Sequence, residues 1–158
     1  MKTEIIKIYT DGAARGNPGK AGWGAVFIFH NKVFELGGRS AHATNNQMEL
    51  TAPIEALKLL KKKKIIGPVE IFSDSKYVIL GITEWIFNWQ KNNWRNAAKK
   101  PVLNRELWGE LFELTKEFKL KWQYVAGHGT DKWNNRADEI ATTFADNEPV
   151  KLKKSMRF

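Results

Sequence analysis

Two aspartates follow the same short pattern at distant places in the chain. Asp11 comes after "KIYT" and Asp74 after "EIFS", so each acid follows an apolar run that ends in a hydroxyl residue. If the two runs are parallel neighbouring strands, about 4.8 Å apart, the two carboxylates face each other at the C-terminal edge of the sheet. Carboxylates this close repel each other unless a proton or a cation lies between them. In a site for phosphates, a divalent cation is the better solution.

Two further acids can reach the same edge. Glu49 lies near the start of a segment expected to form a helix on the sheet, and Asp138 lies in "NRADEIA", shortly after the last expected strand. Four hard oxygen ligands can hold two Mg²⁺ ions about 3.5–4 Å apart, which activate a water and stabilise the leaving oxygen in phosphodiester cleavage. Each acid alone has an ordinary explanation as a turn residue, a helix-start acid or a solvated side chain. The two matching strand ends favour a joint metal site.

A histidine and a glycine-rich segment lie close to these acids in the sequence. His128, in "VAGHGTDKWNN", follows the last expected strand, and the near-neutral pKa of histidine suits proton transfer to a leaving group. A lone histidine is nevertheless more often an ordinary loop residue. The segment "GAARGNPG" after Asp11 is expected to be a loop whose glycines let a nucleic-acid backbone approach main-chain amides. It is not a P-loop, because no Gly-Lys-Ser/Thr follows.

Composition narrows the class of protein. The chain has 158 residues, a formal net charge of +9 and no cysteine. This length suits one domain, and the charge makes nucleic acid the leading partner, with a solubilising basic surface as the alternative. Disulfides, zinc fingers and thiol catalysis are excluded. Apolar runs are far too short for a membrane span, and the N-terminus has a strand pattern, so we expect a soluble cytoplasmic protein with no membrane contact.

Hydrophobic periodicity predicts the elements that position these residues. Strands are expected at residues 4–10, in two parts of 22–40 joined at 30–32, at 67–75 and at 119–128, and helices at 44–64, 75–90, 104–118 and 130–146. This order predicts a mixed α/β fold in which an antiparallel meander comes first and helical crossovers follow.

Some element boundaries are predicted from single residues. Thr44 or Asn45 is expected to cap the first helix and Asn104 the third. Pro53 is expected to kink the first helix or delay its start. The second helix is expected to break near Gly81.

Several segments together resemble type 1 ribonuclease H, the bacterial ribonuclease HI group. They are "YTDGAARGNPGKAGWGA", "TNNQMEL", "FSDSKYV", "GITEWIFNW", and "GH" followed ten residues later by Asp138, in order from about residue 5 to 145. The resemblance implies a ribonuclease H-like fold, a five-stranded mixed sheet of strand order 3-2-1-4-5 flanked by helices. It also implies an endonuclease that cleaves the RNA strand of RNA–DNA hybrids and leaves 3′-hydroxyl and 5′-phosphate ends.

The resemblance further implies roles for individual residues. The metal acids of the family fall on Asp11, Glu49, Asp74 and Asp138, which would hold two Mg²⁺ ions with substrate, with Mn²⁺ a possible substitute, and its mobile catalytic histidine falls on His128. Substrate contacts are implied for Asn17, Asn45 and Asn46 in the minor groove, Tyr77 and Trp85 in a DNA channel, Thr44 and Asn104 at a DNA phosphate, and Trp89 in a basic protrusion.

The tryptophans of residues 85–108 have an ordinary interpretation too. They can be core residues, which is the preferred interpretation for Trp108, or they can hold the sugars of the DNA strand within the basic protrusion. Three positions depart from the pattern of close bacterial relatives. Lys76 replaces a glutamine and can contact a phosphate or compete with metal for the carboxylates; His42 replaces an arginine of the phosphate pocket; Asn135 replaces an acid.

We expect a catalytic domain over residues 1–147 and a loose basic tail over 148–158. The protein is expected to act as a monomer without an obligate protein partner. Two other functions compete with the hybrid nuclease. One is a binding module of the same fold without catalysis, against which the four intact acids count. The other is a DNA-cutting relative such as an integrase or resolvase, against which the asparagines and the tryptophan segment count.

Overall fold

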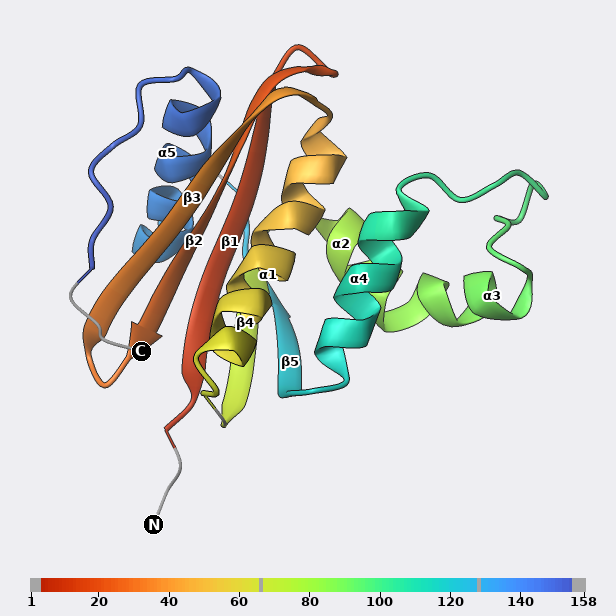
Figure 1. The fold of residues 1–158 in the computed structure, drawn as a ribbon, viewed down its shortest axis with the longest axis horizontal. Helices are drawn as coiled ribbons and strands as arrows, with labels where there is room; N and C mark the ends of the chain where they lie inside the picture. Colours follow the sequence, from red (N-terminus) through yellow and green to blue (C-terminus); the bar gives the residue numbers. More distant parts are fainter. Residues whose placement is uncertain (1–3, 66, 128, 155–158) are drawn as a thin grey trace.

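The computed structural model describes residues 4–65, 67–127 and 129–154 (Figure 1). Its elements are β1 (Ile6–Arg15), β2 (Gly19–Phe29), β3 (Lys32–Ala43), α1 (Asn45–Lys62), β4 (Pro68–Ser73), α2 (Lys76–Leu80), a π-helical turn η1 (Gly81–Trp85), α3 (Ile86–Lys91), α4 (Arg105–Thr115), β5 (Lys119–Tyr124) and α5 (Lys132–Ala145).

The strands form one mixed sheet in the order β3-β2-β1-β4-β5, which confirms the predicted fold class and strand order. β1, β2 and β3 pair antiparallel, whereas β4 pairs parallel with β1, and β5 parallel with β4. His30 and Asn31 form the turn between β2 and β3 with positive φ angles of 51° and 60°. This is the hairpin expected at residues 30–32, and the last two strands arrive through helical crossovers.

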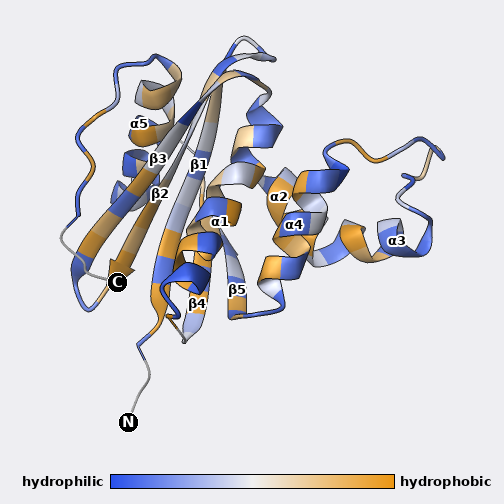
Figure 2. Ribbon diagram, viewed as in Figure 1, coloured by the Kyte–Doolittle hydropathy of each residue, from blue (hydrophilic) through white to orange (hydrophobic). Residues whose placement is uncertain are grey.

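Helices cover both faces of the sheet (Figure 1). α1 and α4 pack on one face over a core that includes Ile6 and Ile8, while α5 packs on the other face against Tyr9 and Val26. Alternate side chains of a strand point to opposite faces, so β1 supplies both cores. β1 changes from hydrophobic to hydrophilic along its length (Figure 2), and its polar half carries the candidate site.

The segment after Asp11 is strand rather than loop, contrary to expectation. Pairing of β1 with β4 ends at Thr10 and Ser73, but pairing with β2 continues to Arg15 opposite Lys20. The small residues at 12–14 are compatible with this, because the main-chain hydrogen bonds of a strand pair need no side chain. Asp11 therefore lies inside a strand, at the point where only one of its two neighbours continues.

The start of α1 is determined by a capping box. The Thr44 hydroxyl accepts the Gln47 N–H at 3.1 Å, and the Gln47 side chain accepts the Thr44 N–H at 2.9 Å. Thr44 is therefore the cap, as predicted. The alternative that Pro53 delays the start of the helix is wrong, because α1 already begins at Asn45 and Pro53 is buried within it.

Two other boundaries differ in detail from the prediction. The expected break near Gly81 is a π-helical turn between α2 and α3. A Cβ at Gly81 would lie 2.1 Å from the Trp108 ring, so only glycine allows this packing. Asn104 precedes α4 but its side chain makes no cap. Its backbone is left-handed, with φ 61°, and its amide instead donates to the Tyr77 hydroxyl at 3.3 Å.

The tail is not loose over residues 148–154. The Glu35 N–H donates to the Lys153 carbonyl at 2.8 Å, and Val150 and Leu152 pack on the core beneath α5. The prediction was wrong because these contacts join residues more than a hundred positions apart, which local composition does not reveal. The domain boundary at residue 147 stays a prediction. None of the helices described here is long and apolar enough to cross a membrane.

Candidate active site

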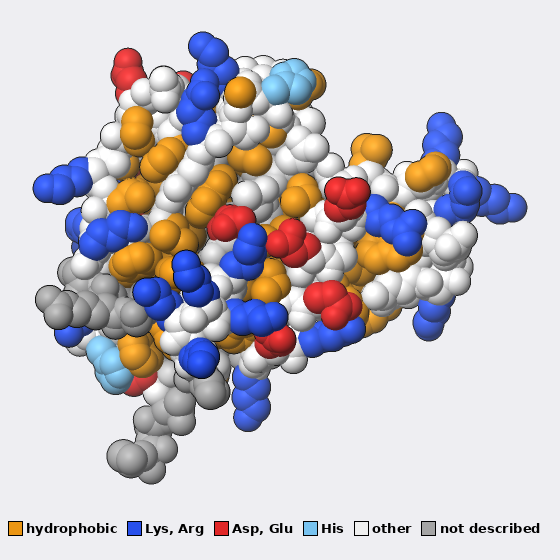
Figure 3. All heavy atoms as spheres, in the orientation of Figure 1, with side chains coloured by type: hydrophobic (Ala, Val, Ile, Leu, Met, Phe, Trp, Pro, Cys, Tyr) orange, Lys and Arg blue, Asp and Glu red, His pale blue; other side chains and the backbone are white. Residues whose placement is uncertain are grey.

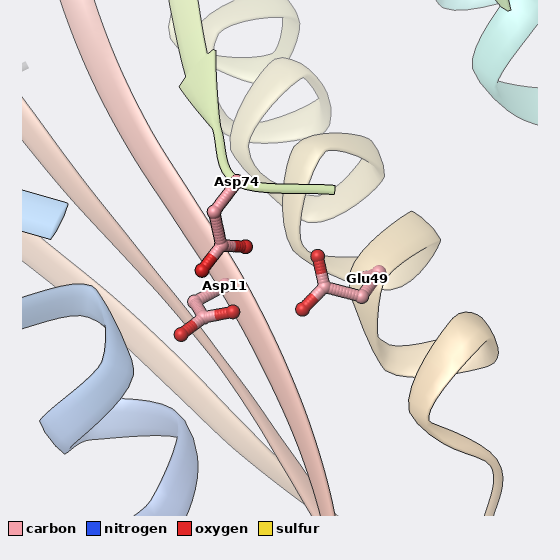
Figure 4. Close-up of side chains that lie close together, drawn as sticks. All are labelled: Asp11, Glu49 and Asp74. Atoms are coloured by element: carbon pink, nitrogen blue, oxygen red, sulfur yellow. The ribbon is translucent and has the colours of Figure 1, made fainter. Parts of the chain in front are cut away.

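Three of the four predicted acids meet at the polar half of the central strands (Figure 4). Oxygen atoms of Asp11, Glu49 and Asp74 all lie within 4.8 Å of one another. Asp11 comes from β1, Glu49 from α1, and Asp74 directly follows β4. The parallel register pairs Thr10 with Ser73, so the next residue on each strand is one of the acids. The repeated strand-end pattern therefore has the geometry that the sequence predicted.

The fourth acid reaches the site from α5, on the other face of the sheet. Asp138 is half-buried and lines the same groove as Asp11. All four acids line one groove. Its other lining residues are Gly12, Ala13, Ala14, Asn45 and Ser75. None of these described lining residues is basic, so the groove presents only carboxylates and neutral groups.

Gly12 allows the helix that carries Glu49 to lie directly on β1. A Cβ at this position would lie 2.4 Å from the Glu49 nitrogen and 2.5 Å from the Met48 carbonyl carbon. The Gly12 N–H donates to Glu49 Oε1 at 2.7 Å and to Asp11 Oδ1 at 2.9 Å. One main-chain N–H therefore holds two of the acids in place, which only close contact between helix and strand permits.

The electrostatics of the acids favour a bound cation. Asp11 is 4% exposed and Glu49 is 5% exposed. Burial raises the pKa of Asp11, and the neighbouring charge of Glu49 raises it further. Burial also raises the pKa of Glu49, and the charge of Asp74 adds to this, while hydrogen bonds from Asp11 and Gly12 oppose it. Without a counterion these groups must retain protons.

One buried oxygen is itself an indication of a ligand. Glu49 Oε2 is buried and has no hydrogen-bond partner among the described residues. A buried carboxylate oxygen without a partner is costly, and hard oxygen ligands are those that Mg²⁺ and Mn²⁺ take. The donor set of the groove therefore fits a divalent metal ion.

The predicted asparagines lie at the rim of this groove. Asn17, in the turn after β1, accepts the Asn45 N–H through its side-chain oxygen at 3.0 Å. Asn45 lines the groove, and Asn46 is exposed beside it at the start of α1. These amides are therefore on the surface next to the acids. Thr44, by contrast, uses its hydroxyl for the helix cap.

A second group of predicted residues forms an aromatic cluster on α2, η1, α3 and α4. The Tyr77 ring is 6.3 Å from Trp85 and 5.1 Å from Trp108, and Trp89 is 6.1 Å from Trp85. Trp108 is fully buried, which confirms the prediction that it is a core residue. Its indole N–H donates to the Tyr77 hydroxyl at 3.2 Å. Trp85 is 38% exposed and forms the open side of the cluster.

The basic protrusion adjoins this cluster through Trp94, whose ring is 6.3 Å from that of Trp89. Figure 3 shows Lys and Arg gathered over α3 and the following loop, at the end of the molecule away from α5. The exposed basic residues of this segment are Lys91, Arg95, Lys99, Lys100 and Arg105. The Arg105 guanidinium lies over the Trp94 ring, 5.2 Å from its centroid. Aromatic and cationic groups thus share one surface.

The structure shows the surroundings of Lys76, His42 and Asn135, the three residues that depart from the pattern of close bacterial relatives. The Lys76 ammonium lies over the ring of Tyr124, 5.3 Å from its centroid. Asn135 donates to the Gly129 carbonyl at 3.1 Å, and His42 is exposed near the end of β3. Tyr124 is 51% exposed beside the acidic site and was not predicted. Its position in a strand of mixed polar and apolar residues concealed it, since an exposed aromatic and a buried one look alike in sequence.

His128 lies outside the described residues, so its predicted role stays a prediction. The preceding residue places the chain close to the acids, because a Cβ at Gly127 would lie 2.7 Å from Asp74 Oδ2. Ser75, which lines the groove and caps α2 through its hydroxyl, was also missed. The "FSDS" pattern that directed attention to Asp74 contains it.

Comparison with known proteins agrees with this fold. The family model for RNase H matches residues 3–146. The ribonuclease H of Thermosynechococcus vestitus is 47% identical over 152 residues, covering 96% of this chain and 95% of the relative. That of Bradyrhizobium diazoefficiens is 50% identical over 137 residues, 87% of each chain.

A solved structure gives the same result at lower identity. LC11-RNase H1, crystallised in complex with an RNA/DNA hybrid, is 28% identical with a TM-score of 0.69, over 90% of this chain and 97% of that one. The fold and site are those of an α/β nuclease with an acidic centre. The chain belongs to the ribonuclease H family, and it is an endoribonuclease of the hydrolase class.

Proposed function

We propose that this enzyme hydrolyses the RNA strand of RNA–DNA hybrids with two divalent metal ions, and leaves 3′-hydroxyl and 5′-phosphate ends. The single observation that supports this best is the convergence of Asp11, Glu49 and Asp74 within 4.8 Å, with one buried oxygen of Glu49 lacking a partner. Asp138 completes the set of four acids in the same groove. Such a set suits Mg²⁺, with Mn²⁺ as a substitute.

The four acids would hold the ions, which supply a reactive water and stabilise charge on the leaving oxygen when bound. Gly12 keeps Asp11 and Glu49 in register through its shared N–H. Water adds to the phosphorus, the bond from phosphorus to O3′ breaks, and O3′ takes up a proton. We assign the delivery of that proton to His128. It is the residue after Gly127 in the sequence, and Gly127 lies close to the Asp74 carboxylate.

Recognition of a hybrid requires that one strand have 2′-hydroxyls and the other lack them. The exposed amides of Asn17, Asn45 and Asn46 are suited to read the minor groove next to the acids. Tyr77, Trp85 and the half-buried Trp89 offer an apolar surface to the sugars of the DNA strand. An enzyme that distinguishes two strands requires two such different surfaces.

Phosphates of the substrate need positive or polar partners. Lys76 is exposed two residues after Asp74, and the cation–π contact with Tyr124 holds its ammonium at the edge of the site. Thr44 and Asn104 are proposed to bind a DNA phosphate. The basic residues of the protrusion supply longer-range attraction to the backbone. The cytoplasmic location and the monomeric state stay predictions.

Cleavage of end-labelled duplexes tests this function. The enzyme is expected to cut only the RNA strand of an RNA–DNA hybrid, and only with Mg²⁺ or Mn²⁺ present. RNA–RNA and DNA–DNA duplexes of the same sequence are the controls. Cleavage of a DNA strand would favour the integrase-like alternative, and hybrid binding without cleavage would favour the binding module. Replacement of His128 by alanine should slow turnover and change its pH profile without abolishing it.

A further inference from the structure

A fully buried acid lies two strands across the sheet from Asp11. Glu35, on the edge strand β3, is 0% exposed. Its carboxylate accepts two hydrogen bonds from the guanidinium of Arg136, at 2.8 and 2.9 Å, and one from the Lys153 N–H at 2.8 Å. These contacts hold the pKa of Glu35 below its usual value despite its burial. The proposed hydrolysis uses neither residue of this pair.

The pair connects three parts of the molecule. Arg136 is on α5, Glu35 is on β3, and residues 148–154 form a C-terminal strap that lies along β3. Arg136 also donates to the Lys151 carbonyl at 2.9 Å, and Lys154 donates to the Glu35 carbonyl at 2.9 Å. The strap therefore closes over the Glu35 carboxylate and shields it from water, while Arg136 stays partly exposed. Shielding makes the two charged hydrogen bonds stronger and their geometry more rigid.

α5 lies directly on the backbone of β2, and its rotation depends both on buried side chains such as Ile140 and on side chains at its flanks. A Cβ at Gly22 would lie 2.3 Å from the Ala141 carbonyl oxygen, and one at Gly24 would lie 2.7 Å from that of Ala137. Consecutive helix residues differ by about 100°, so positions 136 and 138 lie about 200° apart around the axis. Arg136 is bound to Glu35 of β3 on one flank, while Asp138 on the other flank lines the groove that contains Asp11 of β1.

We propose that the ion pair of Glu35 and Arg136, closed by the C-terminal strap, is a positioning device that acts with the packing of α5 on the sheet to set the rotation of this helix and so aims Asp138 at the metal site. This inference rests on the proposed metal role of Asp138. It gives the tail a part in catalysis as well as in stability, because loss of the strap exposes the pair and loosens the helix that carries the ligand.

Metal binding by the full-length protein tests the proposal without reference to activity. Calorimetric titration with Mg²⁺ alone would compare the wild type with Glu35→Gln and with a chain that ends at Asn147. Direct partners of metal ligands typically change affinity about 10–100-fold, so for this more distant support we expect about 3–10-fold weaker binding. The double variant Glu35→Leu with Arg136→Leu removes both charges, which avoids leaving one of them buried alone. It should also bind Mg²⁺ more weakly, even where it remains stable.

A core variant separates positioning from stability. Leu114 is buried in the other core, under α4, so Leu114→Ala should lower the melting temperature and leave Mg²⁺ affinity within about twofold of wild type. Unchanged Mg²⁺ binding in the Glu35 and double variants would overturn the inference, as would an equal loss in Leu114→Ala.

Asp138→Asn distinguishes failure of the inference from failure of the proposed function. If Asp138→Asn weakens Mg²⁺ binding and the Glu35 variants do not, only the inference is wrong. If Asp138→Asn leaves Mg²⁺ binding unchanged, the proposed metal role of Asp138 is wrong and the inference falls with it.

Discussion

The closest contact between helix and strand in the site offers a sharp test, the substitution Gly12→Ala. The new Cβ would lie 2.4 Å from the Glu49 nitrogen, 2.5 Å from the Met48 carbonyl carbon and 2.7 Å from Met48 Cβ. Two of these three atoms are main chain, so a side-chain rotation cannot relieve the clash. To reach an ordinary contact near 3.4 Å, α1 must move away from β1 by about 1 Å.

This displacement has two measurable consequences. Overpacking of this kind costs about 1–3 kcal/mol, which corresponds to a fall in melting temperature of about 2–12 °C for a chain of this size. The hydrogen bond of 2.7 Å from Gly12 to Glu49 is lost at the same time. A misplacement of about 1 Å at a catalytic group can cost about a hundredfold in rate, so we expect kcat to fall by about that factor at saturating Mg²⁺.

Gly109→Ala is the matched control. A Cβ at Gly109, within α4, would meet no atom within 4 Å, so this variant should be as active as wild type and more stable by about 0.4–1 kcal/mol. Initial rates on a labelled RNA–DNA hybrid and thermal melting would be recorded for both variants. Wild-type kcat and melting temperature in Gly12→Ala would refute the argument that close packing at this glycine positions Glu49.

Other perturbations test the site through different measurements. Asp11→Asn should abolish cleavage while hybrid binding, measured by fluorescence anisotropy, is retained or tightened, because it removes negative charge that faces phosphate; retained cleavage would exclude a metal role. Burial raises the pKa of Glu49 to about 7, so the metal-free folded state binds more protons than the unfolded state between its ordinary pKa near 4.3 and that value. In EDTA, the unfolding free energy should therefore fall as the pH rises through this window, more than it does for Glu49→Gln. Parallel curves of unfolding free energy against pH for the two proteins would contradict the raised pKa. Trp85→Ala should weaken hybrid binding by about 1–3 kcal/mol with little change in kcat, and an effect on kcat alone would argue against a stacking surface. Hybrid affinity should fall steeply with salt, and a flat response would mean that the basic protrusion does not touch the backbone.

The local sequence pattern was sufficient to predict the strands and helices and to predict that Asp11 and Asp74 lie close together. Alternation of apolar residues marked the strands, and the repeated hydroxyl-aspartate ending placed Asp11 and Asp74 on neighbouring strands, as the register of β1 and β4 confirms. Asp138 was included because it follows closely after the last expected strand, whereas strand order depended on the resemblance to ribonuclease H. Periodicity alone does not determine which helix crosses to which face.

Features that depend on distant contacts were not predictable from sequence. Glu35 and Arg136 are separated by 101 positions, and nothing in either neighbourhood shows that they pair. The same pairing orders the strap that composition suggested was loose. Asn104 has the residue type of a helix cap, but its left-handed backbone and its bond to Tyr77 depend on tertiary packing. Tyr124 was overlooked because exposure is a property of the fold.

The central claim is that four carboxylates hold a pair of divalent ions against an RNA phosphate. Anomalous scattering from crystals of the enzyme with Mn²⁺ and a non-cleavable RNA–DNA hybrid measures this most directly. The account predicts two Mn²⁺ peaks in contact with oxygens from the set Asp11, Glu49, Asp74 and Asp138, with a phosphate of the RNA strand between them. Ions bound only elsewhere on an enzyme that cleaves hybrids in solution, or the DNA strand lying at the acids, would contradict it.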